Sequence, residues 1–297
     1  MVNKSAMLSV IGRPNVGKST LVNRLVGEKI AIVSNKPQTT RNRIFAVITE
    51  GDTQLVLLDT PGFHKARTRL GDYMVKVVSD SFADVDAMLL IVEPSAEIGK
   101  QEKLLIERIK QTRVRAVLVI NKIDTVKKDE LLAVIAAYSG EHEFDAIVPV
   151  SARTGENIED LKKTMRSYAT EGPQLFPEDM ITDQPERQIC AEIVREKLLR
   201  CLDREIPHGT AVEVTKFSER ENEIIDLDVT IYCEKESHKG IIIGKRGAML
   251  KKIGELARTD IERFMGTKVF LQTWVKVKEN WRDSDAMIRN FGYGADK

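Results

Sequence analysis

The chain has 297 residues, a length typical of about two domains, and its 42% hydrophobic content supplies a buried core for each. Its 46 basic and 45 acidic residues leave a net charge of +1, which excludes a uniformly basic protein but not a local basic patch. Three cysteines without a CxxC pair disfavour a disulfide framework and a zinc site. Residues 1–12 have the length of a strand rather than of a signal peptide, and the most apolar window, 87–92, is too short to cross a bilayer. We therefore expect a soluble, cytoplasmic protein.

Residues 1 to about 170 alternate short apolar runs with amphipathic stretches. The predicted strands are 7–11, 43–49, 53–58, 87–92, 116–120 and 147–150; one helix opens at Lys18, and others cover 68–84, 100–113, 128–139 and 157–169. This alternation predicts an α/β domain whose mostly parallel sheet is covered on both faces. Because ligands of such sheets bind at the carboxyl ends of the strands, a functional site is expected there.

The pattern changes after residue 172. Residues 173–186 are rich in proline and polar side chains and resemble a linker. A helix at 189–202, strands at 211–217 and 224–233, a glycine-bearing turn, a helix at 248–265 and a strand at 268–278 follow, in an α-β-β-α-α-β order. We therefore predict a first domain at 1–172 and a smaller α/β domain at 187–297.

A glycine-rich loop follows the first strand. Its residues Gly12, Arg13, Pro14, Asn15, Val16, Gly17, Lys18 and Ser19 fit the pattern GxxxxGK[ST] between a strand and a helix. Glycines let the backbone wrap closely around phosphates, and N–H groups at the helix N-terminus stabilise their negative charge. Lys18 is expected to reach the β- and γ-phosphates, and Ser19 to hold Mg²⁺ through its hydroxyl.

A second motif, made of Asp59, Thr60, Pro61 and Gly62, ends the strand at 53–58. A carboxylate at this place acts on Mg²⁺ through water, and the Gly62 N–H senses the γ-phosphate. Alone, the four residues are an ordinary turn sequence. Behind a phosphate loop they predict a switch that responds to the γ-phosphate.

A third motif, made of Asn121, Lys122, Ile123 and Asp124, follows the strand at 116–120 and decides the base. The Asp124 carboxylate can accept hydrogen bonds from both the N1–H and the N2 amino group of guanine, a pair that adenine lacks. Ser151 and Ala152, after the strand at 147–150, fit a loop whose backbone N–H reaches guanine O6. GTP is therefore the predicted ligand.

With these motifs the chain resembles the P-loop GTPases, and among them the bacterial Era family, over essentially its whole length. Residues 37–42 (PQTTRN) resemble the first switch of that family. The resemblance implies that Thr40 binds Mg²⁺ together with Ser19 and Asp59, with Thr39 as the alternative. It also implies GTP hydrolysis, with Lys18, Thr40 and Gly62 as the catalytic residues.

Two positions concern the rate of hydrolysis. Many GTPases carry a glutamine after the second motif, where it orients the attacking water. Phe63 stands there and cannot bind water, as the apolar residue of the Era family also cannot; we therefore expect slow intrinsic hydrolysis that a partner accelerates. In related GTPases an asparagine at the position of Asn15 helps to hold a potassium ion, so stimulation by K⁺ is a further hypothesis.

The second domain segregates its charge. Residues 239–278 hold ten basic and three acidic residues, whereas 221–236 hold six acidic residues and one lysine. Within the basic stretch, Gly244, Lys245, Arg246 and Gly247 form a GxxG loop before a helix that carries Lys251 and Lys252. A KH domain uses such a loop to clamp about four nucleotides of single-stranded RNA. The stretch 241–243 and the strand at 227–232 are candidates for the adjoining groove and equally for the core. Trp274 and Trp281 are candidates for stacking on bases or for packing, and we favour packing for both.

Together these patterns predict a GTP-hydrolysing switch that binds RNA. The resemblance implies that the RNA is small-subunit (16S) ribosomal RNA near its 3′ end, that the role is assembly of the 30S subunit, and that the protein, expected as a monomer, is also partly attached to the inner face of the cell membrane. One alternative is a constitutive RNA-binding module whose P-loop domain only senses nucleotide. An ATP-driven RNA remodelling enzyme is disfavoured by Asp124.

Overall fold

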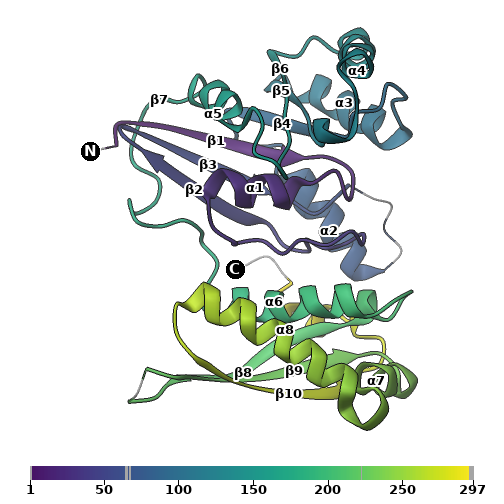
Figure 1. The fold of residues 1–297 in the computed structure, drawn as a ribbon. Coiled ribbons are helices and arrows are strands. Elements are labelled where there is room, and N and C mark those ends of the chain that lie inside the picture. The colour runs from purple at the N-terminus through teal and green to yellow at the C-terminus, as the bar shows by residue number, and fades with distance from the viewer. Residues whose placement is uncertain (1, 64–65, 67, 222, 294–297) are drawn as a thin grey trace. The chain divides into compact units, whose positions relative to one another are not determined.

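The computed structural model describes residues 2–63, 66, 68–221 and 223–293. They form two compact units (Figure 1). Each unit has its own hydrophobic core. The first unit comprises Met1–Ala31, Thr40–Lys65 and Met74–Asp183, and the second comprises Ile32–Thr39, Ala66–Tyr73 and Gln184–Lys297. The division therefore differs from the predicted one: the first unit extends to Asp183, and two short segments from the N-terminal half cluster with the second unit.

The first unit is built on one mostly parallel sheet, as the sequence predicts. Its strands are β1 (Lys4–Ile11), β2 (Ile44–Glu50), β3 (Thr53–Asp59), β4 (Ala87–Val92), β5 (Arg115–Ile120), β6 (Ala146–Pro149) and β7 (Thr170–Glu171). The order is β2-β3-β1-β4-β5-β6, and β2 runs antiparallel to β3 while the other neighbours along this path are parallel. The short strand β7 was not predicted and pairs antiparallel with β1. Two residues are too few for an alternation pattern to reveal them.

Helices cover both faces of this sheet (Figure 1). They are α1 (Lys18–Val26), α2 (Arg69–Asp80, of which the residues up to Tyr73 cluster with the second unit), α3 (Lys100–Thr112), α4 (Lys128–Glu141) and α5 (Ile158–Arg166). Alternate residues of β4 enter different clusters: Leu89 packs with α1 and α5, and Leu90 packs with α3 and α4. Burial on both faces explains why β4 reads as an unbroken apolar run.

The earlier part of the predicted linker, 173–186, is hydrogen-bonded to strands of the first unit. The Gln54 side chain accepts hydrogen bonds from the backbone of Leu175 and Phe176, and the Val47 N–H donates to the Ile181 carbonyl at 2.9 Å. The end of the predicted linker is the first residue of α6, Glu186. The proline-rich composition correctly predicted an irregular segment. It did not predict that the backbone of the edge strand β2 would hydrogen-bond to this segment.

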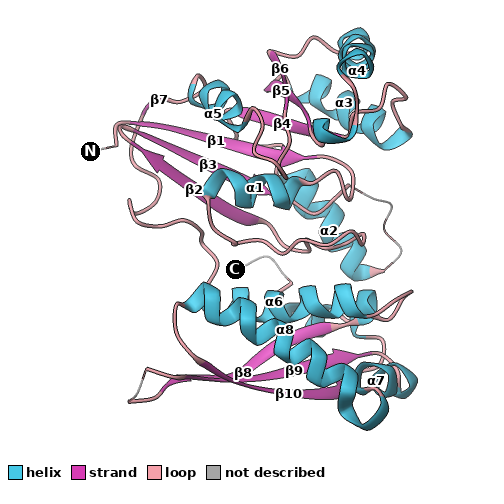
Figure 2. Cartoon of the chain, viewed as in Figure 1, coloured by secondary structure: helices cyan, strands magenta, loops and turns pink. Residues whose placement is uncertain are grey.

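The second unit has the predicted α-β-β-α-α-β order, and its helix at 236–243 occupies the stretch to which the prediction assigned only a glycine-bearing turn. Its elements are α6 (Glu186–Cys201), β8 (Ala211–Glu219), β9 (Ile225–Cys233), α7 (Glu236–Ile243), α8 (Ala248–Met265), β10 (Val269–Val277) and a final helix, α9 (Asp285–Asn290). The sheet order is β10-β9-β8, with β9 parallel to β10 and antiparallel to β8. Helices α6 and α8 lie along one face of the sheet (Figure 2).

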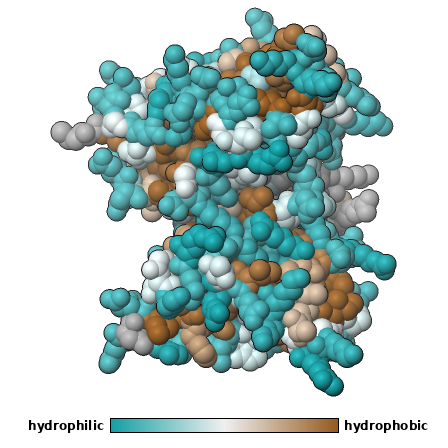
Figure 3. Space-filling view, in the orientation of Figure 1, coloured by the Kyte–Doolittle hydropathy of each residue, from teal (hydrophilic) through white to brown (hydrophobic). Residues whose placement is uncertain are grey.

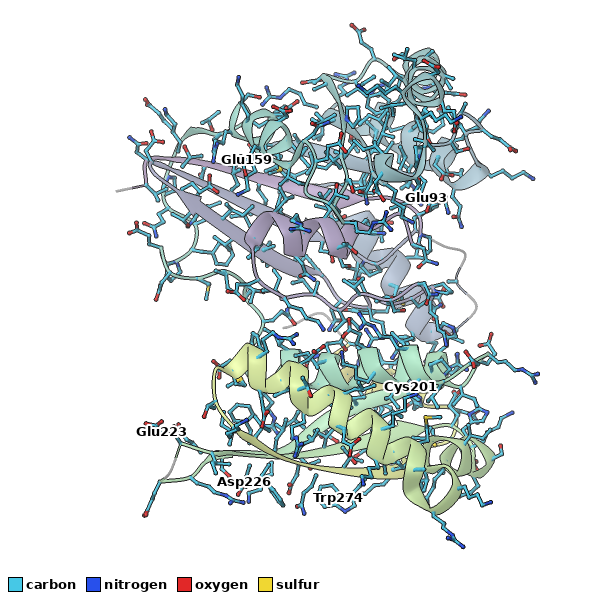
Figure 4. All side chains as sticks on the ribbon, in the orientation of Figure 1. Glu93, Glu159, Cys201, Glu223, Asp226 and Trp274 are labelled. Atoms are coloured by element: carbon cyan, nitrogen blue, oxygen red, sulfur yellow. The ribbon has the colours of Figure 1, made fainter. Side chains whose placement is uncertain are left out.

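The core of this unit contains the apolar stripe of α8, formed by Ile253, Ala257 and Ile261, together with inward residues of the strands. Trp281 is fully buried and donates from Nε1 to the Gly209 carbonyl at 2.9 Å, so its interpretation as a packing residue is confirmed. Trp274 is different. It is 43% exposed on β10 (Figure 4). Leu271 and Val275, which are partly buried and pack against the core, lie on the other face of the strand, so the preference for packing at Trp274 is wrong.

The cysteines of the described chain, Cys190, Cys201 and Cys233, are free. None of the described helices combines the length and the hydropathy needed to cross a bilayer. On the face shown in Figure 3 the surface is mainly hydrophilic, and apolar side chains gather in separate patches on each unit.

Candidate nucleotide and RNA sites

The predicted nucleotide residues lie at the carboxyl ends of four strands. The phosphate loop follows β1, Asp59 ends β3, Asn121 follows β5, and Ser151 lies just beyond β6. Because β1, β3, β4, β5 and β6 are parallel neighbours, these ends share one edge of the sheet. This arrangement is that of the binding crevice of an open α/β sheet.

The phosphate loop leads directly into α1. Gly17, the N-cap residue, has φ +97° and no side chain to cap the first turn, which leaves the N-terminal amides of α1 suited to an anion. The Lys18 ammonium donates to the carbonyl oxygens of Gly12 and Arg13, each at 3.1 Å. Burial lowers the pKa of Lys18 to about 8, against the attraction of the Asp59 carboxylate. Lys18 therefore remains mainly a cation at neutral pH and is suited to phosphate oxygens.

Three oxygen-bearing side chains meet beside Lys18. The Ser19 hydroxyl donates to Asp59 Oδ2 at 2.8 Å and lies 2.9 Å from Thr40 Oγ1. The other Asp59 oxygen, Oδ1, is buried and accepts no hydrogen bond from the described residues. Burial raises the pKa of Asp59 to about 6, although Lys18 and Ser19 lower it. Hydroxyl and carboxylate oxygens are the ligands that a hard divalent cation prefers. Ser19, Thr40 and Asp59 therefore fit the predicted Mg²⁺.

Thr40 and its neighbour Thr39 have different hydrogen-bond partners. The Thr39 hydroxyl donates to the Lys36 carbonyl at 2.6 Å and lies 3.0 Å from Ser34 Oγ, which are contacts within its own segment. Thr40, in contrast, is buried within hydrogen-bonding distance of Ser19. The geometry thus favours Thr40 over Thr39 as the switch threonine for Mg²⁺.

The second motif packs against the phosphate loop. A Cβ added to Gly62 would lie 2.8 Å from the backbone of Pro14, so only glycine fits this approach. The Phe63 N–H donates to the Gly12 carbonyl at 3.2 Å, and the Phe63 ring packs against the Arg108 guanidinium at 4.8 Å. The Phe63 ring is thus held by apolar and cation–π contacts, and the side chain has no polar atom with which to orient water.

The base-reading loops are tied to each other and to the phosphate loop by Asn121. Its buried side chain donates to the Val16 carbonyl at 2.8 Å and accepts from the Ala152 N–H at 3.0 Å. The Ala152 amide therefore already has a partner, and its contact with guanine O6 stays a prediction. Ile123 is buried and forms part of the core.

Asp124 is oriented by the neighbouring loop. The Ser151 hydroxyl donates to Asp124 Oδ1 at 2.6 Å, and the Arg153 guanidinium pairs with Oδ2. The Ser151 hydrogen bond lowers the pKa of Asp124, and the charge of Arg153 contributes. Asp124 is thus an ionised carboxylate that only accepts hydrogen bonds, as guanine recognition requires.

The predicted RNA loop joins α7 to α8. Gly244 has φ +74° and Gly247 has φ +80°, while Arg246, at φ +52°, lies in a short 3₁₀ turn between them. The cationic side chains Lys245, Arg246, Lys251 and Lys252 are exposed, although Lys251 also lies 3.9 Å from Glu255. A tight loop with outward cations followed by a helix N-terminus is suited to a sugar-phosphate backbone.

The apolar stretch before this loop divides between core and surface. Ile242 is buried in the core, whereas Ile241 is 50% exposed. Leu227, Val229 and Ile231 of β9 are also core residues. Within these stretches, Ile241 is the residue best placed to contact a base.

Two residues near the nucleotide site were not predicted. Glu93, directly after β4, contacts both Arg13 and Lys122, and Arg153 pairs with Asp124. The position of Glu93 at the carboxyl end of a central strand was the signal available in the sequence. Arg153 carried no comparable signal, since an arginine in a turn is usually solvated.

Comparisons with known proteins agree with this geometry. Residues 7–122 match the family model described as 50S ribosome-binding GTPase, and residues 205–282 match the KH domain model. The chain is 54% identical to GTPase Era of Ruminiclostridium cellulolyticum over 297 residues, covering 100% of both chains. It is 53% identical to GTPase Era of Clostridioides difficile over 98% of each.

Two solved structures share the whole fold. A crystal structure of Era in complex with MgGDPNP and nucleotides 1506–1542 of 16S ribosomal RNA has a TM-score of 0.94 at 37% identity and covers 99% of this chain and 100% of its own. A variant of Aquifex aeolicus Era bound to GDP and AlF4⁻ has the same TM-score and identity, with coverage of 98% and 100%. The resemblance seen in the motifs is therefore confirmed, and the chain belongs to the Era family of GTPases.

Proposed function

We propose that this GTPase is a molecular switch whose nucleotide state controls its grip on the 3′ end of 16S ribosomal RNA during assembly of the 30S subunit. The observation that carries the proposal is that one chain holds both a guanine-type site, with Asp124 fixed by Ser151, and an exposed GKRG loop, residues 244–247. The relative crystallised with nucleotides 1506–1542 of 16S ribosomal RNA, which has a TM-score of 0.94, supports this choice of RNA. The description of the matching GTPase model names the 50S subunit, but that model spans residues 7–122 and does not include the KH domain.

Crosslinking to total cellular RNA, performed once with a non-hydrolysable GTP analogue and once with GDP, tests this proposal. We expect the 3′ end of 16S ribosomal RNA to be enriched, with different yields in the two nucleotide states. Equal yields would contradict the switch, and enrichment of another RNA would contradict the target.

A constitutive RNA-binding module with a P-loop domain that only senses nucleotide is the second candidate. It is favoured by Phe63, which has no group to orient the attacking water. Single-turnover hydrolysis by the natural protein and by Lys18→Ala separates the two, because the module predicts no difference in rate. Titration calorimetry with GTP and ATP checks the base preference assigned to Asp124.

We further propose Mg²⁺ bound by Ser19, Thr40 and Asp59, stimulation by K⁺ through Asn15, and a cytoplasmic monomer that also binds the inner face of the membrane. The oxygen cluster around Ser19 supports the Mg²⁺ site. For K⁺, equal turnover in Na⁺ and K⁺ buffers would contradict the proposal. Sedimentation of the protein alone and with anionic vesicles tests the monomer and the membrane contact.

A further inference from the structure

We propose that Glu93 is a positioning residue. It sets the placement of the phosphate loop, residues 12–19, relative to the base-reading loop, residues 121–124. Glu93 lies directly after β4, at the carboxyl edge of the sheet where the loops of the nucleotide site meet (Figure 4). The inference rests on nucleotide binding at this site and is independent of which RNA is bound.

The carboxylate of Glu93 bridges the two loops. Its Oε2 accepts a hydrogen bond from the Arg13 guanidinium, in the phosphate loop, and its Oε1 accepts one from the Lys122 ammonium, in the base-reading loop. Lys122 also donates to the Asn15 carbonyl at 2.7 Å. One side chain directly after the central strand β4 thus connects two loops that are about a hundred residues apart in the sequence.

Charge holds this bridge in place. Burial raises the pKa of Glu93, but the hydrogen bond and charge of Lys122, together with Arg13, outweigh burial and hold the pKa below its usual value. The Glu93 side chain is 27% exposed, so the pair is only partly screened by solvent. An ionised carboxylate between two cations gives two charge-assisted hydrogen bonds with fixed directions.

Arg13 is also held from its other side. Its Nε lies 2.6 Å from Glu102 Oε1, and Glu102 is buried in the first turn of α3. Two carboxylates therefore fix the Arg13 side chain and take up its charge. Through Glu93 and Arg13, the phosphate loop is anchored to β4 and α3, which both contribute buried residues to the hydrophobic core.

Binding of three ligands tests the proposal: GDP, which reaches both loops; pyrophosphate, which reaches the phosphate loop; and guanosine, which reaches the base-reading loop. If Glu93 sets the distance between the loops, Glu93→Gln weakens GDP on the order of tenfold, because the amide cannot accept from both cations. The affinities for pyrophosphate and for guanosine should change less than about twofold, since each of these ligands contacts only one loop. Displacement of a fluorescent GDP analogue measures all three.

Glu97→Gln is the matched control, because Glu97 is exposed in the same loop and the change in charge is identical. Circular dichroism and urea unfolding show whether each variant folds. Arg13→Gln breaks the same bridge from its other end and should likewise weaken GDP binding. Adding Glu93→Gln to Arg13→Gln should then have little further effect.

Several outcomes overturn the proposal. Natural affinity for GDP in Glu93→Gln would show that the bridge is unimportant. Tighter binding of pyrophosphate would show that Glu93 acts only as a negative charge near the phosphates, and equal loss of GDP and one fragment would show that it supports a single loop. Multiplicative effects of Glu93→Gln and Arg13→Gln would show that the two residues act separately. Failure of the natural protein to bind GDP would instead contradict nucleotide binding itself.

Discussion

At the scale of single residues, the site depends on positions where only one side chain fits. Gly17 combines a left-handed backbone, at φ +97°, with close contact: a Cβ there would lie 2.3 Å from Asn121 Nδ2. Asn121 is the side chain that ties the phosphate loop to the Ser151–Ala152 loop. A substitution at Gly17 should therefore disturb both loops.

We predict that Gly17→Ala weakens GDP binding by more than about tenfold, because the strain of the left-handed backbone, roughly 1–2 kcal/mol, adds to displacement of Asn121. Gly27→Ala is the control, since Gly27 also has positive φ, at +89°, but meets no atom within 4 Å. It should lose stability in urea unfolding yet keep its affinity for GDP. Equal affinities of the two variants would contradict the role assigned to the Asn121 contact.

Adjacent threonines provide a second comparison. Thr40→Ala should lower the Mg²⁺-dependent rate of GTP hydrolysis by on the order of tenfold or more, because it removes the hydroxyl that lies 2.9 Å from Ser19 Oγ. Thr39→Ala should change the rate much less, because the Thr39 hydroxyl bonds within its own segment. Single-turnover hydrolysis across a range of Mg²⁺ concentrations is the measurement. A larger loss of rate in Thr39→Ala than in Thr40→Ala would identify Thr39 as the Mg²⁺ ligand instead.

At the scale of elements, the sequence was most informative where burial or backbone geometry imposes a pattern. Strand β4 was predicted at its observed bounds, because a strand buried on both faces is an unbroken apolar run, and α8 was predicted from its stripe of Ile253, Ala257 and Ile261. The phosphate-binding motifs were found because phosphate binding demands glycines at fixed positions, and the motif at 121–124 was found because guanine recognition demands a carboxylate after a strand. The contacts of 173–183 and the bridge at Glu93 were not found, since they depend on the three-dimensional neighbours of ordinary polar residues.

The GxxG loop yields a prediction about its own charges. Lys245→Ala combined with Arg246→Ala should weaken binding of the 3′-terminal segment of 16S ribosomal RNA, and should reduce the slope of log K against log salt by roughly 1.4 for two lost phosphate contacts on a single strand. Arg258→Ala combined with Arg263→Ala removes the same charge from α8, where Arg263 already lies 3.3 Å from Asp260. Fluorescence anisotropy over a salt series measures both slopes, and equal slopes would mean that the loop supplies only net charge.

At the scale of the whole molecule, the two units have separate cores. The apolar clusters of the first unit are built on the sheet of β1 to β6, and that of the second on β8 to β10, with no buried residue in common. Each unit therefore has its own cooperative source of stability, and each carries one predicted ligand site. A ligand that binds only the native form of one unit should stabilise that unit.

Scanning calorimetry of the full chain should accordingly show two transitions. GDP with Mg²⁺, at about a hundred times its dissociation constant, should stabilise one of them by about 2.7 kcal/mol, and the RNA segment should stabilise the other. Lys18→Ala is the control: it should abolish the shift caused by GDP and leave the shift caused by RNA, because Lys18 lies in the phosphate loop alone. A single transition that either ligand raises would instead mean that the two cores unfold as one cooperative unit, so that nucleotide binding acts on the stability of the RNA-binding unit directly.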